Sequence, residues 1–423
     1  MGMRTSFCLK GSAMAAVALF AVPSFADYIV RDARIEFADG KVIEKGSVWI
    51  KGDRIGAVGD VAGAPKEAEV INGTGLTVYP GFADAYSTRG LKLPDAPAAA
   101  TPPSNTTTAP PTMWDKNRKG IRAQIKSAEC LNLSSLLSDT RANGLTEAFL
   151  CPGGSMIRGS GALALLTDDK VAAMPFGMEL GFRSGGGGPG GGGGGGAYPG
   201  TLLGYLALQR QTLYDAITYS QTDKPKTDAD LEALVPLVKN QTPAVIAADT
   251  EVEISRALRL SAEFGFRLII SGGKDAYRRA DALAKLNVPV LASITVGDEP
   301  IARPVPDGAP QGVLDDRKAL WRTRADNVKT LMAAGVRVAF SSEGDGASGY
   351  LKNVRKLITL GLGRQDALKA MTSNAAAIFG TSDWGDLAPG KLANVVVMDG
   401  DFASATTRVR FVFVNGKKFE VGK

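Results

Sequence analysis

The chain has 423 residues, of which 44% are apolar and 22% are charged, and its formal net charge is +6. A chain of this length and apolar content can bury a large core, which excludes a wholly disordered protein. Both signs of charge are mixed along the sequence without a basic cluster, so we expect no nucleic-acid partner. The length fits one large α/β barrel with an accessory domain, or two or three domains of ordinary size.

The first 26 residues have the pattern of a secretory signal peptide. Two basic residues precede an apolar run at residues 13–22, and the segment ends with the small residue Ala26. The apolar run is too short to cross a bilayer, which disfavours the alternative of a membrane anchor. We expect cleavage between Ala26 and Asp27 and a periplasmic or secreted protein without a membrane span.

Cleavage would leave two cysteines, Cys130 and Cys151. An oxidising compartment permits a disulfide, but Cys130 falls in a helical pattern and Cys151 follows a strand pattern. The sequence leaves open whether the two pair.

Both ends of the remaining chain have strand patterns. Residues 28–78 alternate between apolar and polar positions and are punctuated by glycines. Residues 394–398 form an apolar strand pattern, and residues 409–418 read as a hairpin around Asn415 and Gly416. Because neither end has enough strands for a core of its own, we expect them to pair. The predicted composite domain is a small β-sandwich of residues 27–79 and 384–423.

Between the two ends the pattern alternates between strand and helix. Strands are predicted at residues 244–248, 267–270, 288–293 and 336–342, with helices at 252–264, 275–285 and 324–334. Repeated units of this size predict a parallel sheet with helices outside, and over about 300 residues a closed (β/α)8 TIM-like barrel is favoured. An open doubly wound sheet is the alternative. We assign residues 80–383 to the barrel.

Two segments interrupt the alternation. Residues 93–112 are rich in Pro, Ala and Thr and follow the first barrel strand, so they predict a long loop over the active face. Residues 184–200 contain a run of glycines, which predicts a flexible surface loop. A phosphate-binding loop would need glycines at fixed offsets followed by Lys-Ser/Thr, and this segment has neither.

Four motifs together resemble one family. They are VYPGFAD at residues 78–84, GVRVAFSSE at 335–343, AMTSNAA at 370–376 and GDLAPGKLANVVV at 385–397. In this order and spacing the chain resembles the amidohydrolase superfamily, in particular its secreted, imidazolonepropionase-like bacterial branch. The resemblance covers nearly the whole mature chain. It implies an α/β fold, a (β/α)8 barrel with a β-sandwich built from both termini, and hydrolysis of C–N bonds at a metal site.

The metal ligands that the resemblance implies are missing. Family members use His-x-His on strand one, histidines after strands five and six, and an Asp after strand eight, whereas this chain contains no histidine. Tyr86 and Thr88 stand at the strand-one positions, Ala247 at strand five, residues 271–273 (SGG) at strand six, and Glu343 replaces the Asp. Zinc prefers nitrogen and sulfur ligands, so we expect a degenerate site without zinc. Oxygen donors leave Mg²⁺ or Ca²⁺ open as cofactors.

Several polar residues remain as candidates for the site. Glu343 and Asp345 are the candidate catalytic acid and base, and the alternative is an ordinary Gly- and Asp-rich turn. The candidate ligand-binding residues are Tyr86, Thr88, Asp249, Glu179 and Arg183.

Each of these candidates has a plainer alternative. Asp84 and Asp249 could instead cap a helix or meet a lysine or arginine. Glu179 and Arg183, four residues apart, could be a solvated pair on a helix.

Two functions follow from this pattern. The first is a non-hydrolytic binding or partner subunit, a pseudoenzyme whose partner is a small polar molecule or a histidine-bearing homologue. The second is a hydrolase of amide or cyclic amide bonds that works with an oxygen-ligand metal site or without metal. The fold alone favours an enzyme, but function resides in the site, and this site lacks the family's ligands. The substrate and the oligomeric state are left open.

Overall fold

The computed structural model describes residues 27–95, 120–154, 156–168, 173–182, 201–301, 311–343 and 346–422. The predicted signal peptide and the glycine-rich segment lie outside the described residues. So does the segment predicted to form a loop over the active face, apart from residues 93–95.

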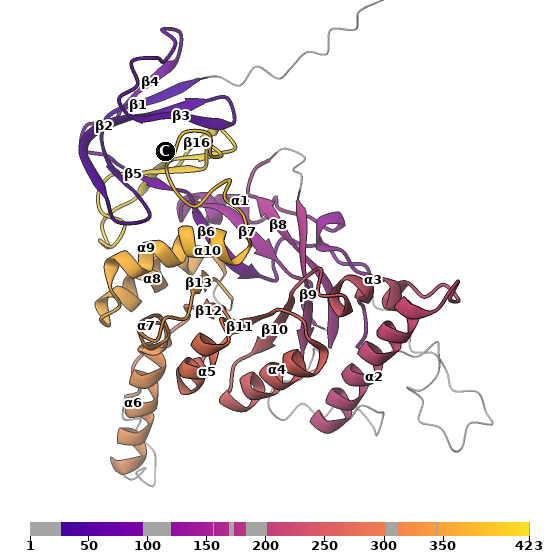
Figure 1. Cartoon of the computed structure of the whole chain (residues 1–423). Coiled ribbons are helices and arrows are strands. Elements are labelled where there is room, and N and C mark those ends of the chain that lie inside the picture. Colours follow the sequence, from indigo (N-terminus) through magenta and orange to yellow (C-terminus); the bar gives the residue numbers. More distant parts are fainter. Residues whose placement is uncertain are drawn as a thin grey trace, which may run out of the picture.

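Strands from both ends of the chain form one sheet at the top of the molecule in Figure 1. β5 near the N-terminus pairs antiparallel with β14 near the C-terminus, Val78 facing Val397. The strand order is β16-β15-β14-β5-β1-β2-β3, with β4 paired to β1. The strands are β1 (Tyr28–Glu36), β2 (Val42–Lys51), β3 (Arg54–Gly59), β4 (Glu69–Asn72), β5 (Thr77–Pro80), β14 (Val395–Met398), β15 (Val409–Val414) and β16 (Lys417–Glu420).

The predicted hairpin at the C-terminus is confirmed. β15 and β16 pair antiparallel, with Val414 opposite Lys417. The two residues between them, Asn415 and Gly416, have φ of 51° and 78°. Two consecutive positive φ angles are what a tight two-residue hairpin turn requires, and Asn-Gly tolerates them best.

The second sheet is a nearly closed barrel. Its eight strands follow chain order, and β13 returns to the first strand: Ser341 Oγ donates to the carbonyl of Tyr86 at 2.9 Å, and Ser342 N donates to Asp84 Oδ1 at 2.9 Å. The predicted barrel is therefore confirmed, and the open sheet does not form. The strands are β6 (Phe82–Ser87), β7 (Leu145–Leu150), β8 (Ile157–Leu165), β9 (Met174–Gly181), β10 (Ala244–Ala248), β11 (Leu268–Gly272), β12 (Val290–Ser293) and β13 (Val338–Ser341).

One barrel strand departs from the repeated strand-helix pattern. β8 runs antiparallel to both β7 and β9, with Ile157 opposite Leu180. Its first residues therefore lie at the end of the barrel where its neighbours have their carboxyl ends. This direction brings Arg158, the second residue of β8, to the mouth of the barrel.

Helices cover the outside of the barrel. The predicted helix at residues 252–264 is α4, whose Thr250 side chain and Glu253 form a capping box and whose end is Gly265 with φ of 73°. Helices are α1 (Leu137–Ala142), α2 (Leu202–Gln221), α3 (Ala229–Val238), α4 (Glu251–Phe264), α5 (Ala280–Lys285), α6 (Gln311–Ala325), α7 (Asn327–Ala333), α8 (Tyr350–Thr359), α9 (Arg364–Met371) and α10 (Ser373–Ile378), with short 3-10 turns at η2 (Ser127–Glu129), η3 (Ala276–Arg279) and η4 (Ala347–Gly349).

Two predicted helices are divided in the structure. The helix expected at residues 275–285 is η3 followed by α5, and the one expected at 324–334 is the end of α6 followed by α7. α6 extends away from the barrel in Figure 1, and Ala325 is its only buried residue.

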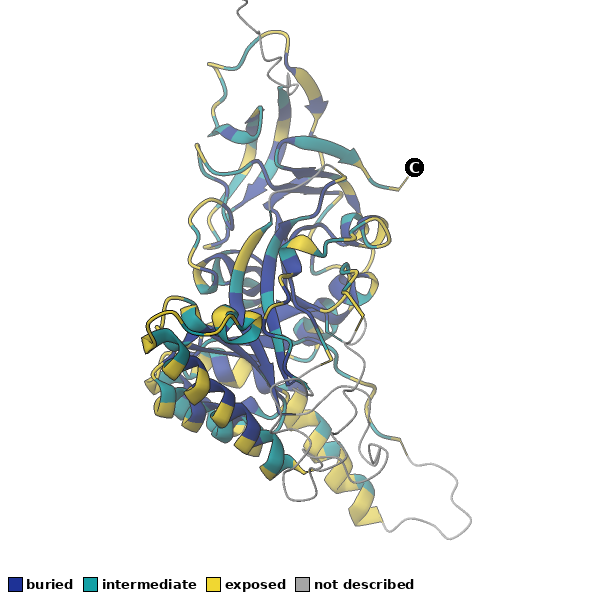
Figure 2. Ribbon diagram, turned by 90° about the vertical axis from the view of Figure 1, so that its right-hand side faces the viewer, coloured by how far each residue is buried: buried dark blue, intermediate teal, exposed yellow. Residues whose placement is uncertain are grey.

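The barrel interior is filled by side chains. Phe149, Val245, Ile269, Leu291 and Ala339 point into it from five strands and are almost completely buried. The strands are dark blue at the centre of Figure 2, whereas the helices around them expose yellow faces. A filled interior leaves the carboxyl ends of the strands as the place where a barrel of this kind can hold a ligand.

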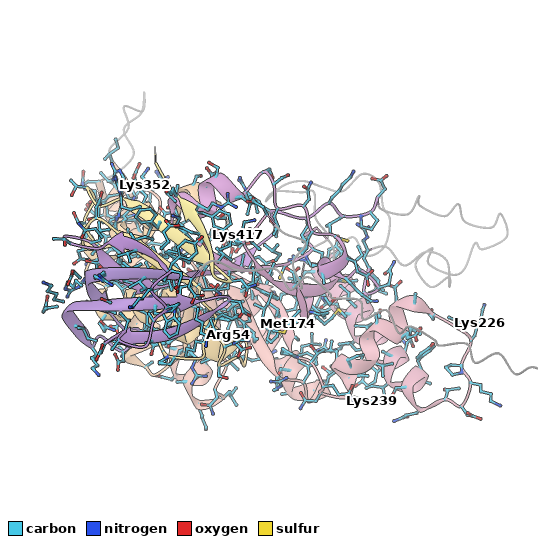
Figure 3. The ribbon with its side chains drawn as sticks, turned by 90° about the horizontal axis from the view of Figure 1, so that it is seen from above. Arg54, Met174, Lys226, Lys239, Lys352 and Lys417 are labelled. Atoms are coloured by element: carbon cyan, nitrogen blue, oxygen red, sulfur yellow. The ribbon has the colours of Figure 1, made fainter. Side chains whose placement is uncertain are left out.

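Three further expectations concern the surface and the cysteines. Cys130 and Cys151 are both free, and Cys151 is buried. Within the described ranges no helix is both long and apolar enough to cross a bilayer. Lys226 and Lys352 project at opposite ends of the molecule, with Lys417 between them (Figure 3), so these positive charges are spread rather than clustered.

Candidate functional site

A pocket of about 350 Å³ opens at the carboxyl ends of the barrel strands. Its lining includes Ala247, Ser271, Gly272 and Glu343, which follow or end β10, β11 and β13. These are the positions to which the family resemblance assigns metal ligands on strands five, six and eight. Of the site residues predicted from the sequence, Asp249 and Glu343 line this cavity.

A buried cluster of three polar side chains lies beside this pocket. Arg158 Nη1 donates to Glu179 Oε1 at 2.6 Å and lies 3.3 Å from the Tyr86 hydroxyl, which itself donates to Glu179 Oε1. Glu179 is completely buried, and the Arg158 side chain is 14% exposed. Three strands, β6, β8 and β9, each contribute one member of the cluster.

A glycine makes room for the guanidinium. A Cβ atom at Gly181 would lie 2.4 Å from Arg158 Nη2, closer than real Cβ contacts occur. Any other residue at this position would push the Arg158 side chain away from Glu179.

The electrostatics of the cluster follow from its burial. Burial raises the pKa of Tyr86 well above its ordinary value of 10, so the hydroxyl stays protonated and donates. Burial also raises the pKa of Glu179, but the charge of Arg158 opposes that shift. Burial disfavours the charge on Arg158, yet the attraction of Glu179 prevails and raises its pKa. Two donors converge on Glu179 Oε1, which favours the ionised carboxylate.

Of the two aspartates at strand ends, Asp249 meets a lysine, as the plainer interpretation expected, whereas the partners of Asp84 are Ser342 and Tyr86. Asp249 lines the pocket, and its Oδ2 accepts from Lys274 Nζ at 2.7 Å. Asp84 is buried and accepts from Ser342 and from the backbone N–H of Tyr86, so it joins the first barrel strand to the last. Burial raises the pKa of Asp84 to about 6, because its hydrogen bonds only partly offset the loss of water.

Glu343 projects its carboxylate into the pocket from the loop after β13. Burial raises the pKa of this carboxyl, the nearby Asp249 charge raises it further, and Lys274 lowers it. The backbone of the residue is held firmly: its N–H donates to Ser341 Oγ at 3.1 Å and its carbonyl accepts from Thr295 Oγ1 at 3.1 Å.

The remaining candidates divide into three groups. Thr88 lies beyond the end of β6 and is exposed. The interpretation of Glu179 as part of a solvated helical pair is wrong, because the residue belongs to β9 and points into the barrel with no exposed surface. Arg183 and Asp345 lie outside the described residues, so the proposed pairs Glu179–Arg183 and Glu343–Asp345 are each represented by one member.

Sequence reasoning missed Arg158, Lys274 and Arg324, which all line the pocket. Arg158 stands in an alternating stretch, IRGSGALAL, that has the period of a strand. The alternation places it on one face of a strand but gives no direction for that strand. Lys274 follows two glycines at the end of strand six, a position that could have been noticed.

The residues at these positions do not fit the metal centre that the family implies. Ala247 and Gly272 have no ligating side chain, Thr88 is exposed beyond the end of β6, and the Tyr86 hydroxyl is already engaged with Glu179. The guanidinium of Arg158 is a fixed positive charge in the same lining, and it would repel a divalent cation. Within the described parts of the chain no three His, Cys, Asp or Glu residues are grouped so that they could hold a metal.

Comparisons with known proteins agree with the fold. Residues 313–419 match the model of the amidohydrolase family. An amidohydrolase from Thermotoga maritima has 20% identity and a TM-score of 0.72, with 93% of this chain and 100% of that chain covered.

Two further solved structures share the fold. A prolidase solved with N-methylphosphonate-L-proline has 17% identity and a TM-score of 0.56, with 94% and 100% of the two chains covered. A putative prolidase from Bifidobacterium longum has 16% identity and a TM-score of 0.51, with 95% and 97% covered. Among curated proteins no relative matches the sequence significantly.

A barrel with its pocket at the carboxyl strand ends, joined to a sheet from both termini, is the architecture of this chain, and its fold is similar to that of these solved structures. The motifs predicted this likeness: the fold resembles that of the Thermotoga maritima amidohydrolase, and residues 313–419 match the amidohydrolase family model.

Proposed function

We propose that this protein is an exported binding protein of the amidohydrolase superfamily that holds a small polar molecule at the barrel mouth without hydrolysing it. The observation that carries the proposal is the buried Arg158–Glu179 ion pair, capped by Tyr86, beside the positions that hold metal ligands in the family. A guanidinium stays protonated near neutral pH and binds no water that it could convert to hydroxide. Among the described residues of the site, none is placed to supply the metal-bound hydroxide that the family's mechanism uses, which supports binding without hydrolysis.

Binding remains possible because the mouth is open and polar. The pocket holds about 350 Å³, enough for a small molecule of the size of an amino acid derivative, and its lining carries charges of both signs. Small peptides are the first ligands to test, because prolidases are among the solved structures that share the fold.

The experiment compares binding with turnover in the same samples. Purified mature protein is incubated with small peptides and cyclic amides, alone and with added Zn²⁺, Mn²⁺ or Mg²⁺, and the release of new amino groups is measured. We expect a ligand-dependent rise in the thermal midpoint with no hydrolysis under any condition. Hydrolysis that depends on the added metal and disappears in the Glu343→Gln variant would contradict the proposal.

The partner and the compartment belong to the same proposal. If the chain assembles with a histidine-bearing homologue, the two should co-purify from the periplasm, and the intact mass of this chain should begin at Asp27. Recovery of the chain from the cytoplasm with residues 1–26 still attached would contradict the proposed export.

A further inference from the structure

The charges that line the pocket are mostly paired with one another. Lys274 pairs with Asp249, and Arg158 pairs with the buried Glu179 beside the pocket. Arg324 makes a two-pronged contact with Asp275 at 2.8 and 3.2 Å. Each of the three cations of the lining therefore already has a carboxylate as its partner.

Two further carboxylates line the pocket, and one of them already accepts hydrogen bonds. Glu253 accepts from the backbone N–H groups of Asp249 and Thr250 at 3.1 and 3.0 Å. Glu343 lines the pocket, and within the described residues its carboxylate has no hydrogen bond or ion pair. The lining thus contains an excess of negative charge that is centred on Glu343.

Further acceptors converge on the same place. Ser271, which is 1% exposed and lines the pocket, has a hydroxyl without a hydrogen-bond partner. Asp249 Oδ1 also lacks a partner. A Cβ atom at Gly272 would lie 2.5 Å from Asp249 Oδ1 and 3.6 Å from Glu343 Oε2, so the two oxygens flank the same glycine. Buried polar atoms without partners cost free energy, which a bound donor would recover.

The chemistry of these acceptors selects one kind of ligand group. An anion would be repelled by Glu343 and Asp249, because the neighbouring cations are already compensated. A divalent metal would need six or more oxygen ligands and would face Lys274 and Arg158. A protonated amine carries one charge and donates up to three hydrogen bonds, which matches one unpaired carboxylate and nearby oxygen acceptors.

We propose that the barrel mouth binds a small molecule through its protonated amino group, with the Glu343 carboxylate as countercharge and Ser271 Oγ as a further acceptor. The inference rests on the proposed binding function and specifies its ligand class. A peptide with a free N-terminus is one such molecule, and blocking its amino group removes both the charge and the donors.

The test titrates the purified mature protein by calorimetry with a set of dipeptides and with their N-acetylated forms. We expect the free dipeptides to bind about tenfold or more tightly than the acetylated ones, because a charge-assisted hydrogen bond is lost on acetylation. Glu343→Gln should remove this preference and Ser271→Ala should weaken it. Glu67→Gln, which changes an exposed glutamate in the terminal sheet region, is the matched control and should leave binding unchanged.

The outcomes separate the two proposals. Equal affinity for free and acetylated dipeptides, or no binding of any free dipeptide, would overturn the amine site and leave the non-hydrolytic function standing. Cleavage of a dipeptide during the titration would overturn the non-hydrolytic function, while a retained preference for the free amine would support the amine site. Binding of Mg²⁺ that competes with the dipeptide and depends on Glu343 would instead assign these acceptors to a metal.

Discussion

At the scale of single residues, the buried charges decide what the barrel mouth can do. Arg158 and Glu179 form a largely buried ion pair, in which Arg158 compensates the charge of the completely buried Glu179. Removing Arg158 leaves the buried Glu179 without this countercharge, whereas removing both charges together leaves no uncompensated carboxylate.

The first prediction concerns this pair. Arg158→Met should lower the free energy of unfolding by about 3–5 kcal/mol, because Glu179 loses its countercharge. Arg158→Met combined with Glu179→Gln should recover a large part of that loss. Urea denaturation followed by circular dichroism measures both. Arg210→Met is the control: its ion pair with Glu263 at 2.7 Å is on the surface, and it should cost less than about 1 kcal/mol. An equal loss of unfolding free energy for Arg158→Met and Arg210→Met would contradict the interpretation of Arg158–Glu179 as a buried ion pair.

A second residue, Glu147 of β7, links the barrel to the terminal sheet. It is buried and accepts from Thr146 and from Asn394, whose Oδ1 in turn accepts from the N–H of Asn415 in the hairpin turn. Burial raises the pKa of Glu147 to about 7 from its ordinary value of 4.5. The folded protein thus holds a proton over a pH range in which the unfolded chain releases it.

The second prediction is the resulting pH dependence. The contribution of Glu147 to stability should be fully present below pH 4.5 and should be lost as pH rises through about 7. The loss amounts to roughly 3 kcal/mol at most, at 1.4 kcal/mol per unit of pKa shift. Glu147→Gln should flatten this part of the stability profile, with Asp84 retaining a smaller dependence up to about pH 6. Denaturant midpoints of the wild-type protein and of Glu147→Gln between pH 4 and 8 measure this dependence. If the two midpoints changed in parallel with pH, the assignment of the dependence to Glu147 would be contradicted.

At the scale of elements, strand direction and turn geometry place the site. The antiparallel β8 carries Arg158 to the mouth, and the turn of the β15–β16 hairpin meets Gly52, between β2 and β3 of the same terminal sheet. Gly416 of that hairpin approaches another backbone so closely that an added Cβ would lie 1.8 Å from the carbonyl oxygen of Gly52. Gly265, at the end of α4, has a similar φ but no atom within 4 Å of its added Cβ.

The third prediction compares these two glycines. Gly265→Ala should lower the free energy of unfolding by about 1 kcal/mol, because the alanine must adopt a left-handed backbone conformation but meets no other atom. Gly416→Ala should cost clearly more, since the backbone of residue 52 must also move. Thermal midpoints of the two variants test the difference. Equal shifts would mean that the close approach between the hairpin and Gly52 is relieved without cost.

At the scale of the whole molecule, the absence of histidine removes the family's link between metal binding and folding. A metal that binds only the folded state adds its binding free energy to stability. The oxygen donors of this mouth bind zinc less tightly than nitrogen and sulfur ligands do.

The fourth prediction is that the protein purifies without stoichiometric zinc and that its thermal midpoint is unchanged by a chelator. Elemental analysis and differential scanning calorimetry before and after treatment measure the two quantities. A zinc-dependent protein treated in parallel shows that the chelator is active. About one zinc per chain, lost together with stability, would contradict the degenerate-site interpretation.

The sequence by itself determined the fold class and the absence of the histidine ligands that the family resemblance implies. Strand and helix periods and four family motifs predicted the barrel and the sheet from both termini, and the Asn415–Gly416 pair predicted the hairpin, because these signals are local along the chain. The count of histidines required no structure.

Only the tertiary structure decided which charges meet. An alternating pattern shows that Arg158 and Glu179 belong to strands, but it gives neither the direction of β8 nor its register with β9, so it cannot place the two side chains 2.6 Å apart. Strand pairing depends on contacts between segments distant in sequence, and the period-two alternation is the same for a strand running in either direction. The burial of Glu179, which makes it the partner of Arg158 and not a surface charge, also depends on contacts between segments distant in sequence.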